Sequence, residues 1–208
     1  MLKNWIKKKL VSFKIRKHKS IQGFIIPCEA VKLFELAACI KKNNSLIVEI
    51  GSWKGKSTFC LALGLMNGHI AAIDGFNCMG DQESSKVYSE AKGNISLLEQ
   101  FKSNMSRLKV SQKIIVCQGN SQDFINDFSS IDLLFIDGDH SIDGCYTDFL
   151  GYSDAIVPGG YIVFHDYDPT RKELGPTWVI ENKILTEQEY SFVERVGSLW
   201  IGQKRNGK

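Results

Sequence analysis

Short runs of apolar residues that alternate with helix-like segments constrain the fold of this 208-residue chain more than any other feature. Five runs are nearly continuous in apolar residues, and each ends in a polar or acidic residue followed by a turn. Strands buried on both faces of a parallel sheet have this composition, and their alternation with helices is typical of βαβ units. The sequence therefore predicts buried strands at residues 45–51, 69–75, 113–119, 131–139 and 159–166.

The C-terminal part of the chain carries two further strand-like runs that adjoin one another. Residues 190–196 and 197–204 meet at Val196 and Gly197, which favours an antiparallel hairpin. Helical patterns predict helices at residues 56–65, 84–108, 122–128, 143–155 and 177–185. The predicted fold class is α/β: a Rossmann-like, doubly wound, mostly parallel seven-stranded sheet with a C-terminal antiparallel hairpin and helices on both faces.

Residues 1–22 form a basic N-terminal segment that contains seven lysines and one arginine but no acid. This segment accounts for the net charge of +3, because the remainder of the chain is slightly acidic. An amphipathic helix over residues 2–19 could contact an anionic membrane surface, although packing against the domain is the preferred interpretation. Residues 23–208 are predicted to form one domain.

Composition excludes several classes of protein. No apolar run approaches the roughly 20 residues of a membrane span, and lysines interrupt the N-terminal apolar residues, unlike a signal peptide. The cysteines form no C-x-x-C pair, so neither a zinc site nor a redox motif is predicted. Reduced thiols in a cytoplasmic protein are expected.

The segment GSWKGKST, residues 51–58, differs from a phosphate-binding loop by one missing residue. Glu49 precedes its first glycine by two positions, and Asp74 ends the next predicted strand. Such carboxylates would repel a phosphate, and they favour a cationic or hydroxylated ligand at the carboxyl ends of the strands.

The motif E/D-x-G-x-x-x-G is matched by Glu49, Gly51 and Gly55. Through this motif the chain resembles class I S-adenosylmethionine-dependent methyltransferases. The resemblance implies that Asp74 accepts the ribose hydroxyls, that residues near Ser57 receive the carboxylate of the cofactor, and that residues after the third strand contact adenine. The implied cofactor-binding residues are Glu49, Gly51, Ser52, Gly55, Ser57, Asp74, Gly75, Asn120, Ser121, Gln122 and Asp137.

Acidic and histidine side chains follow the fourth and fifth predicted strands, in the sequences IDGDHSIDG and PGGYIVFHDY. Neighbouring strands lie roughly 5 Å apart, so these ends should meet at one edge of the sheet. Carboxylate oxygens with one imidazole suit Mg²⁺ or another divalent metal.

These two sequences are similar to a subfamily of small bacterial O-methyltransferases, and more distantly to catechol-type and macrolide-sugar O-methyltransferases that use a divalent metal. The resemblance implies metal ligands at Asp137, His165 and Asp166, with His165 standing where metal-using relatives usually carry an acid. Asp139 is the candidate for the carboxylate oxygen that His165 does not supply. The resemblance also implies catalytic roles for Asp137 and for His140, which would act as the general base because its ordinary pKa lies near neutrality.

The predicted function is S-adenosylmethionine-dependent methylation, with the resemblance implying O-methylation of a sugar, polyketide or phenolic hydroxyl, assisted by a divalent metal. Two alternatives remain open: a metal-dependent oxygenase in which His165 and Asp166 hold iron, and a non-catalytic protein that binds the cofactor. The expected partners are a small-molecule acceptor and a second copy of the chain in a homodimer, with no nucleic acid.

Overall fold

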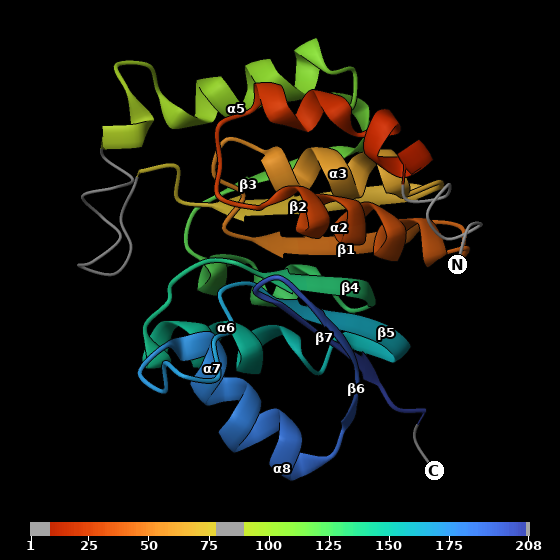
Figure 1. Cartoon of the computed structure of the whole chain (residues 1–208), viewed down its shortest axis with the longest axis vertical. Helices are drawn as coiled ribbons and strands as arrows, with labels where there is room; N and C mark the ends of the chain where they lie inside the picture. The colour runs from red at the N-terminus through yellow and green to blue at the C-terminus, as the bar shows by residue number, and fades with distance from the viewer. Residues whose placement is uncertain (1–8, 78–89, 207–208) are drawn as a thin grey trace.

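The computed structural model describes residues 9–77 and 90–206, which contain one seven-stranded sheet with the strand order β3-β2-β1-β4-β5-β7-β6 (Figure 1). The first five strands are parallel, and β7 runs antiparallel to both of its neighbours, β5 and β6. The predicted fold class is therefore confirmed. The strands are β1 Ser45–Ile50, β2 Gly68–Asp74, β3 Ile114–Gln118, β4 Ile131–Ile136, β5 Ile156–Phe164, β6 Tyr190–Val196 and β7 Leu199–Lys204.

Strand order reverses beside β1, which pairs with β2 on one side and with β4 on the other. A ligand of an open parallel sheet binds at such a reversal, outside the carboxyl ends of the strands. Asp74 ends β2, while Asp137 directly follows β4 and His165 directly follows β5. The topology therefore brings the predicted polar residues to one edge of the sheet.

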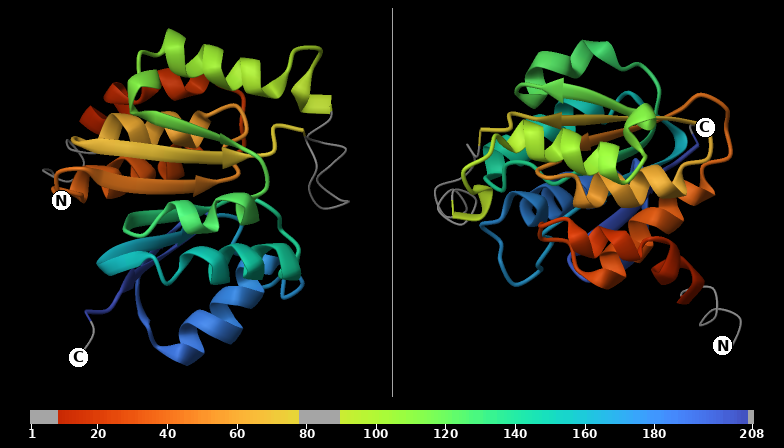
Figure 2. Two further views of the ribbon diagram at one scale, coloured as in Figure 1. Left: turned by 180° about the vertical axis from the view of Figure 1, so that it is seen from behind. Right: turned by 90° about the horizontal axis from the view of Figure 1, so that it is seen from above.

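Helices pack against both faces of the sheet, as Figures 1 and 2 show. Alternate residues of β1 enter different cores: Ile47 packs with α2, α3 and α5, whereas Val48 packs with α6 and η4. This alternation follows from the two-residue period of a strand. The helical elements are η1 Arg16–Ser20, α2 Pro27–Cys39, α3 Lys56–Gly64, α5 Leu97–Arg107, η2 Ser111–Lys113, η3 Ser121–Asp127, α6 Ile142–Tyr152, α7 Gly175–Val179, η4 Ile180–Ile184 and α8 Leu185–Glu187.

Three helix predictions differ from the structure. The predicted helix at 84–108 falls partly outside the described residues, and within them residues 93–96 are not helical. Gly93 has a φ of 74°, and the hydroxyl of Ser96 accepts from the amide of Glu99 to start α5. The predicted helix at 122–128 is a 3₁₀ helix, η3, and the one at 177–185 contains a π-helical turn, η4.

The described part of the basic N-terminal segment packs against the domain. Val11, Ile15 and Ile21 are buried in the same core as α2 and α3, while the lysines of residues 9–20 are exposed. Among the described residues, no helix is both long enough and apolar enough to cross a bilayer.

Candidate active site

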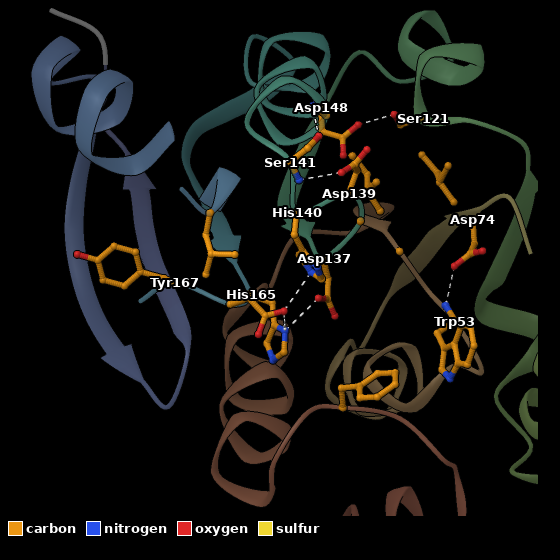
Figure 3. Close-up of a pocket in the computed structure, with 18 of the residues that line it drawn as sticks. Trp53, Asp74, Ser121, Asp137, Asp139, His140, Ser141, Asp148, His165 and Tyr167 are labelled. Carbon is orange, nitrogen blue, oxygen red and sulfur yellow. Dashed lines mark hydrogen bonds and ion pairs between the residues drawn. The ribbon is translucent and has the colours of Figure 1, made fainter. Parts of the chain in front are cut away.

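A cavity of about 1130 Å³ opens at the carboxyl ends of β1 to β5 (Figure 3). Pockets for single small ligands usually measure roughly 300–1,000 Å³, so this cavity has room for a cofactor together with an acceptor. Of the residues predicted from the sequence, those that line it are Gly51, Asp74, Gly75, Asn120, Ser121, Gln122, Asp137, Asp139, His140, His165 and Asp166. Glu49, Ser52, Gly55 and Ser57 are not among the lining residues.

The glycine turn after β1 places backbone at the wall of the cavity. Gly51 has a φ of 88°, and a Cβ atom there would overlap the carbonyl oxygen of Asp137. Its amide donates to Ile73 O at 2.9 Å, which ties the turn to β2. Only glycine allows β1 and β4 to approach this closely at their ends.

Asp74 fixes the other side of the turn. Its carboxylate accepts from the amide of Trp53 at 2.8 Å and from that of Phe76 at 2.6 Å. Burial raises the pKa of Asp74, these two hydrogen bonds oppose the shift, and the charge of Asp137 adds to it. Each carboxylate oxygen keeps a second lone pair, so Asp74 can still accept from hydroxyl groups of a ligand in the cavity.

Glu49 lies beneath the turn rather than at the cavity. Its side chain is fully buried, and the hydroxyl of Thr58 donates to it. Burial raises the pKa of Glu49 to about 7, against the lowering effect of hydrogen bonds from Ser57, Thr58 and Ser52. Glu49 therefore connects β1 to the first turn of α3, and Asp74 is the carboxylate of this pair that faces the cavity.

Lys56, the lysine of the segment that resembles a phosphate-binding loop, points elsewhere. Its ammonium group donates to the carbonyl of Gly23 at 2.8 Å, and Lys56 does not line the cavity. A phosphate cradle requires this lysine to reach the ligand, so the geometry agrees with the interpretation that the segment is not such a loop.

Two histidines and two aspartates form a connected cluster at the ends of β4 and β5 (Figure 3). His140 Nε2 lies 3.0 Å from Asp166 Oδ2, and His165 Nδ1 lies 3.0 Å from both Asp166 Oδ2 and Asp137 Oδ1. Burial by itself would raise the pKa of Asp166, but hydrogen bonds from His140 and His165 hold it well below its ordinary value. Asp166 is thus an ionised carboxylate shared by two imidazoles.

His165 is surrounded by carboxylates on both sides of its ring. Nδ1 faces Asp137 and Asp166, and Nε2 lies 3.3 Å from Glu29 Oε2 on α2. Burial alone would lower the pKa of His165, but the charge and hydrogen bond of Asp137, followed by those from Asp166 and Glu29, raise it far above its ordinary value. His165 is therefore a buried imidazolium with both nitrogen atoms engaged.

The side chains that could share one metal ion differ from the predicted set. Ligand atoms of Asp137, His140 and Asp166 lie within 4.8 Å of one another, and within the described residues this is the only such group. His165 is not part of this group, and its two ring nitrogens face carboxylates of Asp137 and Glu29 at 3.0 and 3.3 Å. Asp139 accepts from the amide of Ser141 at 2.8 Å and lies outside the group.

Backbone conformation at the cavity edge is unusual for residues other than glycine. Trp53, Phe76 and Asp166 have φ angles of 50°, 49° and 56°, in the left-handed region. All three follow strands that end at the cavity. Such conformations cost about 1–3 kcal/mol each and concentrate at ligand-binding sites.

Comparison with known proteins identifies the family. Residues 48–167, more than half of the chain, match the family described as methyltransferase domain. The chain belongs to this methyltransferase family. An uncharacterised protein of Acanthamoeba polyphaga mimivirus is 32% identical over 144 residues, which cover 67% of this chain and 59% of that relative.

Solved structures similar to this chain include two O-methyltransferases. The TomG enzyme of Streptomyces achromogenes, which takes part in tomaymycin synthesis, was solved with SAM; it has a TM-score of 0.63 and 16% identity over 96% of this chain and 89% of its own. An O-methyltransferase of Bacillus cereus, solved with SAH, has a TM-score of 0.63 and 17% identity over 99% and 100%. At these identities the likeness establishes the fold.

Two buried carboxylates that contact cavity residues were missed by the sequence analysis. Glu29 follows Pro27 at the start of α2, and its carboxylate accepts from the amide of Ile26, which is a recognisable helix-start pattern. Asp148 lies on α6 between the buried residues Cys145 and Phe149. A charged residue on the buried face of an amphipathic helix was the available signal.

A Gly51→Ala substitution should reduce the free energy of unfolding by about 2–3 kcal/mol, because it adds backbone strain and a clash with Asp137 O. Urea denaturation followed by circular dichroism measures this loss. Gly159→Ala is the matched control, since Gly159 has a φ of 78° but its nearest neighbour would be Asn206 Oδ1 at 3.8 Å. It should cost about 1 kcal/mol. Equal losses in the two variants would contradict the proposed close approach.

Proposed function

We propose that the protein transfers a methyl group from S-adenosylmethionine to a hydroxyl group of a small-molecule acceptor. The observation that carries the proposal is the position of His140, whose imidazole lines the same cavity as Asp74 and the glycine turn. A candidate base and candidate cofactor-binding residues that share one cavity, in a chain of the methyltransferase family, support the proposal. The O-methyltransferase neighbours solved with SAM or SAH support the choice of cofactor.

The cofactor end of the cavity lies at β1, β2 and β3. Here Gly51 offers close backbone approach, and Asp74 offers acceptor lone pairs to the ribose hydroxyls. After β3, beyond Asp74, the cavity is lined by Asn120, Ser121 and Gln122. The adenine ring of the cofactor would lie against these residues. The bound cofactor supplies an electrophilic methyl group.

At the other end of the cavity, His140 accepts the proton of the acceptor hydroxyl. Its Nε2 atom lies 3.0 Å from Asp166 Oδ2, so the carboxylate orients the ring and stabilises the imidazolium that forms. Ring orientation by a hydrogen-bonded carboxylate is a recurrent device for a histidine base. The pair His140–Asp166 therefore performs the proton transfer without a covalent enzyme intermediate.

The donor set of Asp137, His140 and Asp166 fits a divalent metal such as Mg²⁺, since it combines two carboxylates with one imidazole. Asp137 and Asp166 would hold the ion, with His140 available either as a ligand or as the base. A bound ion would lower the pKa of the acceptor hydroxyl.

The acceptor end includes Tyr167, Leu174 and Arg195. The guanidinium of Arg195 lies 5.2 Å from the centre of the Tyr167 ring, and it donates to the carbonyl of Gly197 at 3.0 Å. An aromatic ring, an aliphatic side chain and a cation suit a phenolic, polyketide or sugar acceptor.

An Asp74→Ala substitution tests the cofactor site. Wild-type protein should bind S-adenosylhomocysteine (SAH) in calorimetry, and Asp74→Ala should bind it roughly 10- to 100-fold more weakly, because hydrogen bonds from the ribose to a charged group are lost. Asp154→Ala, at an exposed position after α6, is the control and should bind normally. Unchanged binding by Asp74→Ala would contradict the ribose assignment.

Activity is tested with labelled S-adenosylmethionine and a defined panel of phenols, sugars and hydroxylated polyketides, with and without Mg²⁺. Label transfer to a panel member supports catalysis. Tight SAH binding without transfer to any member in the presence of metal would favour a protein that binds the cofactor without catalysis. Failure of wild-type protein to bind SAH would overturn the proposal.

The location, the oligomeric state and the partners of the protein are also proposed. We expect a cytoplasmic enzyme that acts on a small molecule, as a homodimer and without nucleic acid. Liposome sedimentation of protein with and without residues 1–19 would test contact of the basic segment with anionic membranes.

A further inference from the structure

Asp148 is a buried carboxylate that the proposed mechanism does not use. It lies on α6, is 4% exposed, and lines the cavity next to Ser121. It is not part of the cluster of Asp137, His140 and Asp166. Burying an ionised carboxylate costs free energy unless hydrogen-bond donors surround it, so Asp148 should have a hydrogen-bonding role.

The hydrogen bond from Ser121 to Asp148 fixes the direction in which the serine hydroxyl donates its proton. The hydroxyl of Ser121 donates to Asp148 Oδ1, as the dashed line in Figure 3 shows. Tyr152, one turn further along α6, donates to the carbonyl of Ser121 at 2.5 Å and holds its backbone. A hydroxyl has one proton and two lone pairs, so Ser121 can only accept from a third group.

The charge of Asp148 maintains this direction near neutral pH. Burial raises the pKa of Asp148 to about 6, while the hydrogen bond from Ser121 opposes the shift and the charge of Asp139 adds to it. Above that pH the carboxylate is mostly ionised and can only accept. The proton between the two side chains therefore belongs to Ser121.

Position in the cavity indicates which part of a ligand meets these acceptors. Asp74 ends β2, and Ser121 begins η3 just beyond the neighbouring strand β3. A nucleoside whose ribose lies at Asp74 extends its base toward Ser121 and Gln122. The group at C6 of the base can then reach the lone pairs of Ser121.

We infer that Asp148 is a positioning residue that holds Ser121 as a hydrogen-bond acceptor and thereby selects a purine with an amino group at C6. This inference rests on the proposed function, since it takes the adenosyl cofactor as the ligand. An adenine amino group donates to Ser121, whereas a purine with an oxygen at C6 would set one acceptor against another. Such an unmatched buried polar pair weakens binding strongly.

The test compares SAH with S-inosylhomocysteine, in which an oxygen replaces the amino group, by calorimetry on the full chain. Wild-type protein should prefer SAH by at least tenfold. In Asp148→Leu the hydroxyl of Ser121 can rotate and donate, so the preference should fall to within about threefold. Asp143→Leu, an exposed position on the same helix, is the matched control and should keep the wild-type preference.

A merely structural role of Asp148 would weaken both ligands equally, so an unchanged preference in Asp148→Leu would overturn the inference. If that variant does not fold, as judged by circular dichroism, Ser121→Ala replaces it and should likewise lose the preference for SAH. An unchanged preference in Ser121→Ala would also overturn the inference. If wild-type protein binds SAH and S-inosylhomocysteine equally well, the inference is overturned but the proposed function is not. Wild-type protein that binds neither ligand overturns the proposed function with it.

Discussion

Replacing His140 with alanine should lower kcat for methyl transfer by roughly 10²- to 10⁴-fold while leaving the affinity for SAH unchanged. The imidazole is the candidate proton acceptor, and its side chain is 13% exposed within the cavity. Its partner Asp166 sits at the end of β5, so removal of the ring leaves the cofactor end near Asp74 intact. The measurement uses labelled S-adenosylmethionine and the most rapidly methylated compound of the acceptor panel.

Two further variants separate proton transfer from folding. His69→Ala removes an exposed histidine near the start of β2, at the opposite end of the sheet, and should keep full turnover. Asp166→Asn keeps the size of the orienting side chain but loses its charge, so its kcat should lie between that of wild-type protein and that of His140→Ala. Undiminished turnover by His140→Ala would remove the proposed base.

Replacing Glu29 with alanine should lower the free energy of unfolding by about 3–5 kcal/mol, because it leaves the Nε2 side of the buried His165 ring without its carboxylate partner. Glu29 is 2% exposed, and its carboxylate lies 3.3 Å from His165 Nε2. It also accepts from the amide of Ile26 at 2.8 Å and from the amide and hydroxyl of Ser198 at 2.8 and 2.9 Å. One side chain therefore joins α2 to β5 and to the turn between β6 and β7.

The matched control for Glu29 is Glu35→Ala on the same helix. Glu35 is partly exposed and lies 3.3 Å from Lys32, so its loss should cost less than about 1 kcal/mol. Urea denaturation at pH 6 measures both variants. Similar small losses for the two substitutions would contradict the role of Glu29 in joining these elements.

The effect of Glu29 should depend on pH in a defined direction. Burial would raise the pKa of Glu29, but hydrogen bonds from His165, Ile26 and Ser198 lower it below its ordinary value. Its contribution to stability is therefore present above the unfolded-state pKa, near 4.3, and is lost as the pH falls through the folded-state pKa. The pKa of His165 is raised, so its contribution is complete below about pH 6.5 and declines as the pH rises.

The stability difference between wild-type protein and Glu29→Gln should consequently have its full value above about pH 4.5 and should shrink as the pH falls below it. Asp137 and Asp166 still raise the pKa of His165 in the variant, so the His165 contribution declines in parallel in both proteins as the pH rises to 8. Denaturation curves at intervals from pH 3 to pH 8 give this difference directly. A difference that stays constant across the whole range would show that the ionised pair does not contribute.

The sequence determined the fold class and the edge of the sheet at which the site lies. Each predicted strand overlaps an observed one, because buried parallel strands are continuous in apolar residues and end in recognisable turns. The polar residues Asp74, Asp137 and His165 lie at strand ends, so their neighbourhood followed from topology alone. The family also followed from the motif that Glu49, Gly51 and Gly55 share with methyltransferases.

Local patterns were less informative where the chain departs from regular structure. Helix α2 was absent from the prediction although Ala30, Leu33, Phe34 and Ala37 repeat with helical spacing. The break before α5 depends on the left-handed conformation of Gly93, which a single glycine in a helical pattern does not reveal.

Tertiary structure alone decided what each polar side chain faces. Spacing along the chain treats Glu49 and Asp74 alike, yet one is buried beneath the glycine turn and the other lines the cavity. Likewise, His140 and His165 differ because Glu29, 136 residues away in the sequence, occupies the second nitrogen of His165. Charge state and hydrogen-bond direction depend on neighbours from distant segments, and sequence patterns carry information only about residues a few positions apart.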